Sequence, residues 1–195
     1  SGIIYYAFSR EESVRKGVLT DDLHIGMDFN LDPMSAVVCV REGQTLKAVD
    51  EIVMYGSNTD EMADEIKQRY PDRRITVYPD PASKQRKTSA GGRTDLSILQ
   101  NAGFTIKVRN SHPAIRDRIN AVNSRLCSTT GVRALYVDPQ CKQTIASLER
   151  QTYKTGTSQP NKDGFDHMND ALGYLVEYLY PIRKQNQITQ PQRWS

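Results

Sequence analysis

The amino-acid sequence predicts an α/β fold with a mixed sheet, in which three antiparallel strands are continued by parallel strands and helices cover both faces. Two observations carry this prediction. Apolar or alternating runs rich in Val and Ile follow one another between residues 23 and 55, separated by Asp-Pro and Glu-Gly turn signals. After residue 57, helical and strand-like patterns alternate, which is typical of parallel strands joined by right-handed helical crossovers.

The antiparallel half is expected from residues 23–30, 35–43 and 45–55, which are three consecutive strand-like runs. The first run ends at an Asp-Pro turn signal and the second at a Glu-Gly signal, so each strand folds back along its predecessor.

A helix is expected over residues 57–72, because Ser, Asn and Thr offer N-caps at its start and apolar residues recur every four positions at Met62, Ile66 and Tyr70. Pro71 stops it. The same kinds of signal place the remaining elements: a strand over 73–80 ending in a carboxylate, a basic Gly-containing loop over 81–94, a helix over 95–103, a strand over 104–110, a helix over 112–128, a short edge strand or hairpin arm over 133–140, a helix over 141–153, a polar loop over 154–164 and a helix from about Phe165 to Tyr180. This order matches the ribonuclease-H-like fold.

Composition favours a single globular domain with appendages. The chain has 195 residues, of which 37 % are hydrophobic and 25 % charged, so neither disorder nor a membrane protein is indicated. No apolar run approaches the roughly 20 residues that span a bilayer, and no signal peptide is recognisable, so we expect a protein that is not secreted. Three scattered cysteines argue against a disulfide framework or a structural zinc site.

We divide the chain into three parts. Residues 1–21 have no long periodic pattern and are expected to be an N-terminal extension or the remnant of a linker. Residues 22–181 form the predicted domain, and residues 182–195 are expected to be a flexible basic tail.

Acidic side chains stand at both ends of the stretch Asp28-Phe-Asn-Leu-Asp32, with an asparagine midway between them. An EF-hand calcium loop does not fit, because its sixth position is Pro33 where glycine is needed and its twelfth is Cys39 where Glu is expected. A polar strand end is the simpler alternative. Asp28, however, follows an apolar run, and an ionised carboxylate that is partly buried there needs a neutralising partner such as a cation.

Further acids occupy comparable places. Asp80 ends the strand over residues 73–80, which pairs with the first strand in the inferred fold. Asp166 and Asp170 lie four residues apart on one face of the last helix, beside its apolar stripe, where like charges repel unless a cation or base is near. Solvated surface acids are the alternative for this pair alone.

Together, acids from two strands and a helix predict a metal centre. Oxygen-only ligands suit Mg²⁺ or Mn²⁺, and two such ions about 4 Å apart activate water and stabilise the leaving oxygen of a phosphodiester. A basic stretch follows Asp80 directly and is expected to contact the DNA backbone through Lys84, Arg86, Lys87 and Arg93.

Three stretches, "HIGMDFNLDPMSAVV", "VYPDPASKQRKTS" and "GFDHMNDALGYLVEYL", resemble the nuclease domain of the large terminase subunit of tailed double-stranded DNA bacteriophages, most like those of headful-packaging short-tailed phages. The resemblance covers residues 22–180. It implies a divalent-metal-dependent endonuclease that cuts concatemeric viral DNA during genome packaging. It also implies that Asp28, Asp80 and Asp166 are catalytic metal ligands, that Asp170 competes with Asp166 for the third place, and that Asp32 and His167 are auxiliary.

The resemblance further implies partners. The family's large subunit carries an N-terminal packaging ATPase, and the sequence has no G-x-x-x-x-G-K-[ST] motif, so we expect a C-terminal fragment. The other implied partners are double-stranded DNA, the small terminase subunit and the portal ring, and no membrane partner is expected. The implied place of action is the procapsid in the host cytoplasm. Two alternatives stay open: another ribonuclease-H-like nuclease of the junction-resolvase or transposase type, and a non-catalytic domain that binds DNA or the portal.

Overall fold

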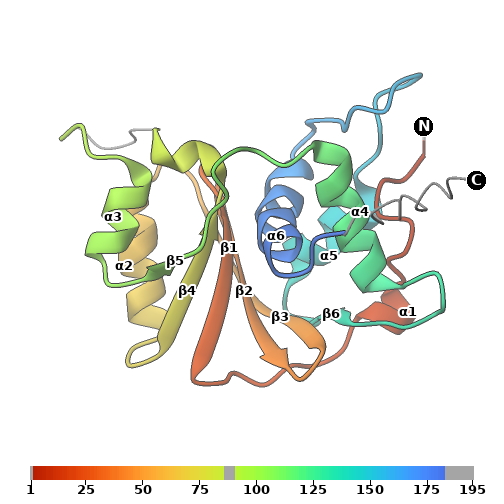
Figure 1. Cartoon of the computed structure of the whole chain (residues 1–195), viewed down its shortest axis with the longest axis horizontal. Coiled ribbons are helices and arrows are strands. Elements are labelled where there is room, and N and C mark those ends of the chain that lie inside the picture. The colour runs from red at the N-terminus through yellow and green to blue at the C-terminus, as the bar shows by residue number, and fades with distance from the viewer. Residues whose placement is uncertain (1, 86–90, 183–195) are drawn as a thin grey trace, which may run out of the picture.

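A mixed sheet of six strands lies at the centre of the computed structural model, which describes residues 2–85 and 91–182 (Figure 1). Its strand order is β5-β4-β1-β2-β3-β6. The strands are β1 (Asp22–Asp28), β2 (Met34–Glu42), β3 (Thr45–Met54), β4 (Arg74–Pro79), β5 (Thr105–Ile106) and β6 (Leu135–Val137). β1, β2 and β3 are antiparallel neighbours, β4 and β5 continue the sheet parallel to β1, and β6 is parallel to β3. The predicted fold class is confirmed.

Helices cover both faces of the sheet, with α2 and α3 on one side and α4, α5 and α6 on the other (Figure 1). The described helical segments are α1 (Arg10–Ser13), α2 (Thr59–Arg69), the 3₁₀ turn η1 (Pro81–Lys84), α3 (Asp95–Asn101), α4 (Ile115–Leu126), α5 (Lys142–Arg150) and α6 (Asp166–Leu179). The caps agree with the sequence, since Asn58 accepts a hydrogen bond from the backbone N–H of Glu61 at the start of α2.

Alternation along β1 separates two apolar cores. Ile25 and Met27 are fully buried on the side of α2, whereas Gly26 lies against α6. Because side chains alternate along a strand, Asp28 follows Gly26 on the α6 side. The alternation therefore directs the terminal carboxylate of β1 towards the last helix.

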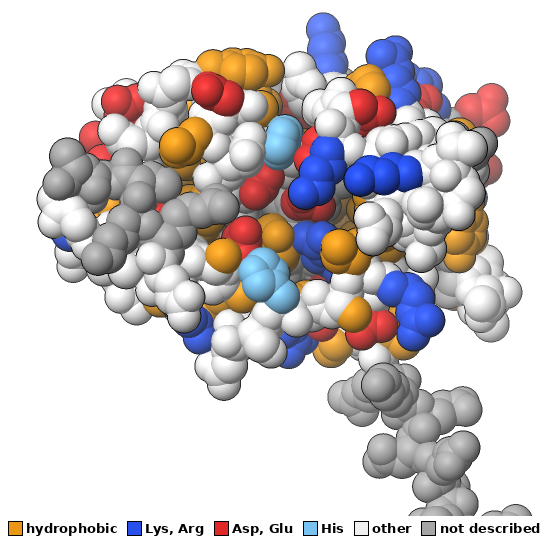
Figure 2. All heavy atoms as spheres, turned by 90° about the horizontal axis from the view of Figure 1, so that it is seen from above, with side chains coloured by type: hydrophobic (Ala, Val, Ile, Leu, Met, Phe, Trp, Pro, Cys, Tyr) orange, Lys and Arg blue, Asp and Glu red, His pale blue; other side chains and the backbone are white. Residues whose placement is uncertain are grey.

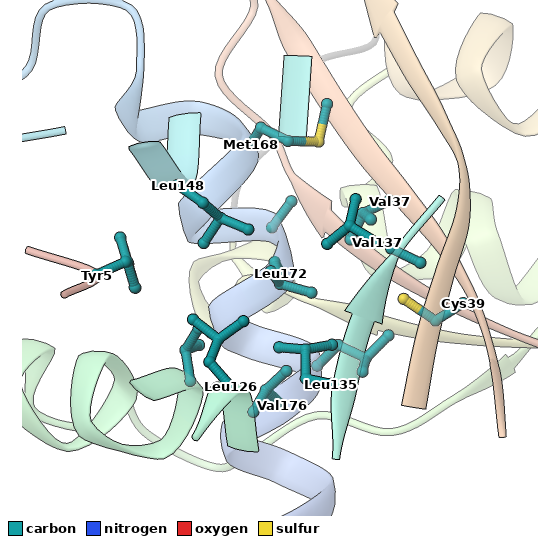
Figure 3. Close-up of a cluster of buried hydrophobic side chains, with 14 of the residues drawn as sticks. Tyr5, Val37, Cys39, Leu126, Leu135, Val137, Leu148, Met168, Leu172 and Val176 are labelled. Carbon is teal, nitrogen blue, oxygen red and sulfur yellow. The ribbon is translucent and has the colours of Figure 1, made fainter. Parts of the chain in front are cut away.

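The apolar stripe of α6 fills the larger core (Figure 3). Met168, Leu172 and Val176 are buried on successive turns of the helix, and they face buried side chains of β2 and β6 such as Val37 and Val137. Burial of this face, at roughly 2 kcal/mol for each large apolar side chain, holds α6 on the sheet. The position of its polar first turn is thereby fixed relative to the strand ends.

Two elements differ from the predictions, and the structure decides between the alternatives left open for a third. The strand expected over 104–110 is limited to Thr105–Ile106, because the chain then turns towards α6, where Arg109 forms an ion pair with Glu177. The segment expected as an edge strand or hairpin arm is an edge strand, since it pairs in parallel with β3. The turn η1 follows Asp80 where a loop was expected, and Asp80 caps it.

The N-terminal extension packs against the domain. Ile4 and Tyr5 are buried in the core that α6 fills, and the Ile4 backbone N–H donates to the Gln151 carbonyl oxygen at 3.0 Å. Val14 forms a parallel bridge with Val137 at the edge of the sheet. The sequence did not predict that this segment packs against the domain. Its apolar residues show no periodicity, and the residues that they contact lie more than 100 positions away in the chain.

Within residues 2–85 and 91–182, none of the helices combines the length and the apolar character needed to cross a membrane. Apart from Ile182, the tail predicted over 182–195 lies outside the described residues, as do Arg86 and Lys87 of the basic stretch.

Candidate metal centre

The carboxyl ends of β1 and β4 lie side by side. The two strands pair in parallel with Met27 opposite Pro79, and the Asp80 backbone N–H donates to the Met27 carbonyl oxygen at 3.1 Å. Asp28 and Asp80 therefore leave the sheet at the same edge, and both are buried. This confirms the predicted pairing of the strands that carry the two acids.

The first turns of α6 bring two more carboxylates to this edge. Asp166 is the first residue of the helix and is buried, while Asp170 lies one turn later. Burial, together with the charges of Asp28 and Asp166, raises the pKa of Asp170 to about 7, although the nearby Arg118 guanidinium lowers it. His167 contacts both Asp28 and Asp166, so these acids of β1 and α6 lie on either side of one imidazole ring.

Histidines pair with three of the four carboxylates. His167 lies between two of them, with Nδ1 3.1 Å from Asp28 Oδ2 and Nε2 3.7 Å from Asp166 Oδ1. His112 Nε2 lies 3.2 Å from Asp80 Oδ1. The hydrogen bond to Asp28 is the main reason why the pKa of His167 is raised.

Asp170 has a different partner. Arg118 Nη2 lies 3.4 Å from Asp170 Oδ1, and its guanidinium carbon lies 4.6 Å from the centre of the Tyr174 ring. In this arrangement each acid is paired with a cationic or titratable side chain, and only Asp170 is paired with one whose charge is permanent.

An open groove of about 510 Å³ adjoins the acids. Basic and amide side chains line it beside Asp166 and Asp170, among them Arg118, Gln151, Lys154, Gln159 and Lys162. Figure 2 shows acidic side chains in a hollow at this end of the molecule, with histidine and basic side chains around them. Buried carboxylates surrounded by Lys and Arg side chains suit a polyanionic ligand that binds together with cations.

The donor chemistry of the site suits a hard divalent cation, because every candidate ligand offers carboxylate oxygens. Among the described residues, no three Asp, Glu, His or Cys side chains lie close enough to enclose an ion as they stand. His112, His167 and Arg118 contact the carboxylates that would hold such an ion.

Three other predicted site residues have partners outside the four acids of this centre. Asp32 Oδ1 accepts a hydrogen bond from the Gly56 backbone N–H at 2.8 Å, which ties the β1–β2 turn to the loop after β3. Lys84 Nζ donates to Asn110 Oδ1 at 3.1 Å, and Arg93 pairs with Asp60 at 3.2 Å.

Asn30 lies near the centre, with Nδ2 3.5 Å from His167 Nε2.

Sequence reasoning missed two partners of the acids, His112 and Arg118. Both belong to the basic region between Lys107 and Arg133, whose charge was visible in the sequence. Which member of that region faces which acid depends on how α4 and the segment before it pack against the rest of the domain, and residue spacing along the chain does not reveal it.

The sheet order and the acidic end of β1, β4 and α6 define a ribonuclease-H-like domain with a candidate metal centre. Residues 25–179 match the family described as Terminase RNaseH-like domain, and the chain belongs to that family. No curated protein sequence matches it significantly.

Solved structures with a similar fold come from bacteriophage terminases. The large terminase of a thermophilic bacteriophage, in complex with ATP-γ-S, superposes with a TM-score of 0.73 at 18 % identity over 91 % of this chain and 45 % of that one. The P22 large terminase nuclease domain gives 0.69 at 13 % identity, over 93 % and 94 % of the two chains. The nuclease domain of the large terminase (g2p) from bacteriophage SPP1 with bound Mn gives 0.54 at 20 % identity, over 84 % and 94 %. The chain thus spans less than half the length of the large terminase from the thermophilic phage.

Proposed function

We propose that this domain is a divalent-metal-dependent DNA endonuclease, the nuclease domain of a large terminase subunit that cuts concatemeric viral DNA during genome packaging. The observation that carries the proposal is that Asp28 and Asp80 leave two paired strands at one edge of the sheet, where His167 contacts both Asp28 and Asp166. Asp166 and Asp170 in turn line a groove together with Lys and Arg side chains. The bound Mn in the related SPP1 domain supports it.

Asp28, Asp80 and Asp166 would hold Mg²⁺ or Mn²⁺, with Asp170 as a further ligand. Bound metal supplies an activated water and a Lewis acid for the phosphodiester. The chain itself positions the carboxylates on rigid elements, while His167 and His112 keep the acids paired before the metal arrives. The packaging ATPase, the small terminase subunit and the portal ring are proposed partners, and the procapsid in the host cytoplasm is the proposed place of action.

Cleavage of supercoiled plasmid tests the proposal. We expect the purified domain to convert plasmid to nicked and linear forms with Mn²⁺ or Mg²⁺, and EDTA to stop the reaction. A non-catalytic DNA-binding or portal-binding domain would bind without cutting, and chelator would not change its affinity. Cutting of four-way junctions but not of linear duplex would favour a resolvase-type enzyme instead.

Metal binding is expected to strengthen as pH rises from 6 to 8.5. Below a pKa of about 7 the Asp170 carboxyl is protonated, and a protonated His167 holds Asp28 more firmly, so protons compete with the metal for both acids. The increase in melting temperature on adding Mn²⁺, measured by differential scanning fluorimetry, should therefore grow with pH. Asp170→Asn should reduce this growth, and a pH-independent shift in the wild type would contradict the expectation.

The basic stretch after Asp80 is proposed to contact the DNA backbone. Changing Lys84 and Arg93 together to Ala removes two positive charges, so DNA affinity should fall and the salt dependence of log K should become shallower by about two units. Fluorescence anisotropy with a duplex in Ca²⁺ would measure both. Lys16→Ala with Lys67→Ala, two lysines outside the site, is the charge-matched control, and an unaltered salt slope in the first pair would contradict the proposal.

A further inference from the structure

Arg118 is a largely buried guanidinium beside the metal centre. Its side chain is only 11 % exposed, and it reaches from α4 across α6 to Asp170. It passes over Gly173, where an added Cβ would lie 2.8 Å from Arg118 Cγ and 3.0 Å from its Cδ. The absence of a side chain at Gly173 therefore gives Arg118 its path to the acids.

The guanidinium is held in place by stacking and charge. It lies 4.6 Å from the centre of the Tyr174 ring, an arrangement that stabilises a cation on an aromatic face. Its Nη2 is 3.4 Å from Asp170 Oδ1, longer than a good hydrogen bond, so the contact is an ion pair. The contact therefore depends on charge and not on a directional hydrogen bond.

The pairing sets Asp170 apart from the other acids. Asp28, Asp80 and Asp166 contact histidine side chains, whereas Asp170 contacts a guanidinium, which carries its charge at every physiological pH. A divalent ion that uses Asp170 must compete with this charge and bind close to it. Arg118 thus opposes metal binding at this carboxylate.

We propose that Arg118 is a positioning residue of the metal centre: it acts as a built-in counter-ion that holds Asp170 while no metal is bound and surrenders it when a divalent ion arrives. The guanidinium lines the same groove as Asp166 and Asp170, so after release its N–H donors face the space in which a DNA phosphate would lie. This inference rests on the metal centre of the proposed function.

Calorimetric titration with MnCl₂ at pH 8.5, without DNA, tests the proposal independently of cleavage. Arg118→Gln removes the competing charge, so Mn²⁺ should bind more tightly, on the order of tenfold. Arg118→Lys keeps the charge and should stay within about threefold of the wild type. If Arg118→Gln does not fold, Arg118→Met provides an uncharged side chain that better preserves the packing against Tyr174.

A double-mutant cycle separates this role from a structural one. In the Asp170→Asn background, Arg118→Gln should no longer increase Mn²⁺ affinity, because the shared carboxylate is gone. Equal affinities of the wild type and Arg118→Gln, or a gain that persists without the Asp170 carboxylate, would overturn the proposal. A protein that binds Mn²⁺ in the expected pattern but does not cut DNA would instead leave this inference intact and contradict the nuclease function.

Discussion

Asp28→Asn is expected to abolish DNA cleavage, with a loss of at least about a thousandfold in rate, while duplex binding remains within a few-fold of the wild type. The substitution keeps the shape of the side chain but removes the charge that binds a cation. If bound metal stabilises the transition state by about 4 kcal/mol, its loss corresponds to roughly a thousandfold in rate. Plasmid nicking in Mn²⁺ measures the rate, and anisotropy in Ca²⁺ measures binding.

Asp22→Asn is the matched control, because it removes an acid from the opposite end of β1. Asp22 is exposed and pairs with Arg74, and exposed pairs of this kind contribute about 1 kcal/mol or less. It should cut DNA as fast as the wild type. Asp80→Ala should resemble Asp28→Asn, and a variant of either acid that cuts normally would show that the metal centre lies elsewhere.

Gly26→Ala is expected to destabilise the fold by about 3 kcal/mol or more, at the upper end of overpacking effects. An added Cβ would lie 2.1 Å from the Ala171 carbonyl oxygen and 2.9 Å from its carbonyl carbon, with Leu175 Cβ at 3.1 Å. The first two contacts are with backbone, which no side-chain rotation relieves. Either α6 must move away from the sheet or β1 must bend.

The melting temperature of Gly26→Ala should fall by about 6–12 °C for a domain of this size. Gly2→Ala is the control, because an added Cβ there meets no atom within 4 Å. Urea unfolding provides a second measurement. If both variants were half unfolded at the same urea concentration, the close approach of α6 to β1 would be contradicted. A partly folded Gly26→Ala protein should also bind Mn²⁺ more weakly, since the same approach brings Asp166 and Asp170 towards Asp28.

The family resemblance and the inferred positions of the acids point to the same residues. Both depend on the ends of two strands and the start of one helix. Asp28 and Asp80 each follow an apolar strand, and the sequence alone placed them at one edge once the two strands were taken as neighbours. The i,i+4 spacing of Asp166 and Asp170 placed both on one face of a helix. These placements depend on residues that are close together in the chain, so apolar periodicity and turn residues predict them from the sequence.

Contacts between residues far apart in the chain could not be predicted from the sequence. The burial of Ile4 and Tyr5 beside α6 joins residues at opposite ends of the sequence, and no local pattern encodes such a contact. The absence of a side chain at Gly26 is visible in the sequence, but its purpose is not, because the clash it prevents is with the backbone of a helix about 145 positions later.

The sequence by itself determined the mixed sheet, the order of its strands and helices, and the acids of the candidate site, because apolar periodicity, caps and turns act over a few residues. The tertiary structure decided which partner faces which acid: His167 lies beside Asp28, His112 beside Asp80, and Arg118 beside Asp170. Pairing of charges depends on distances of a few ångströms between side chains of different elements. The packing of α4, of the segment before it and of α6 against the strand ends sets those distances.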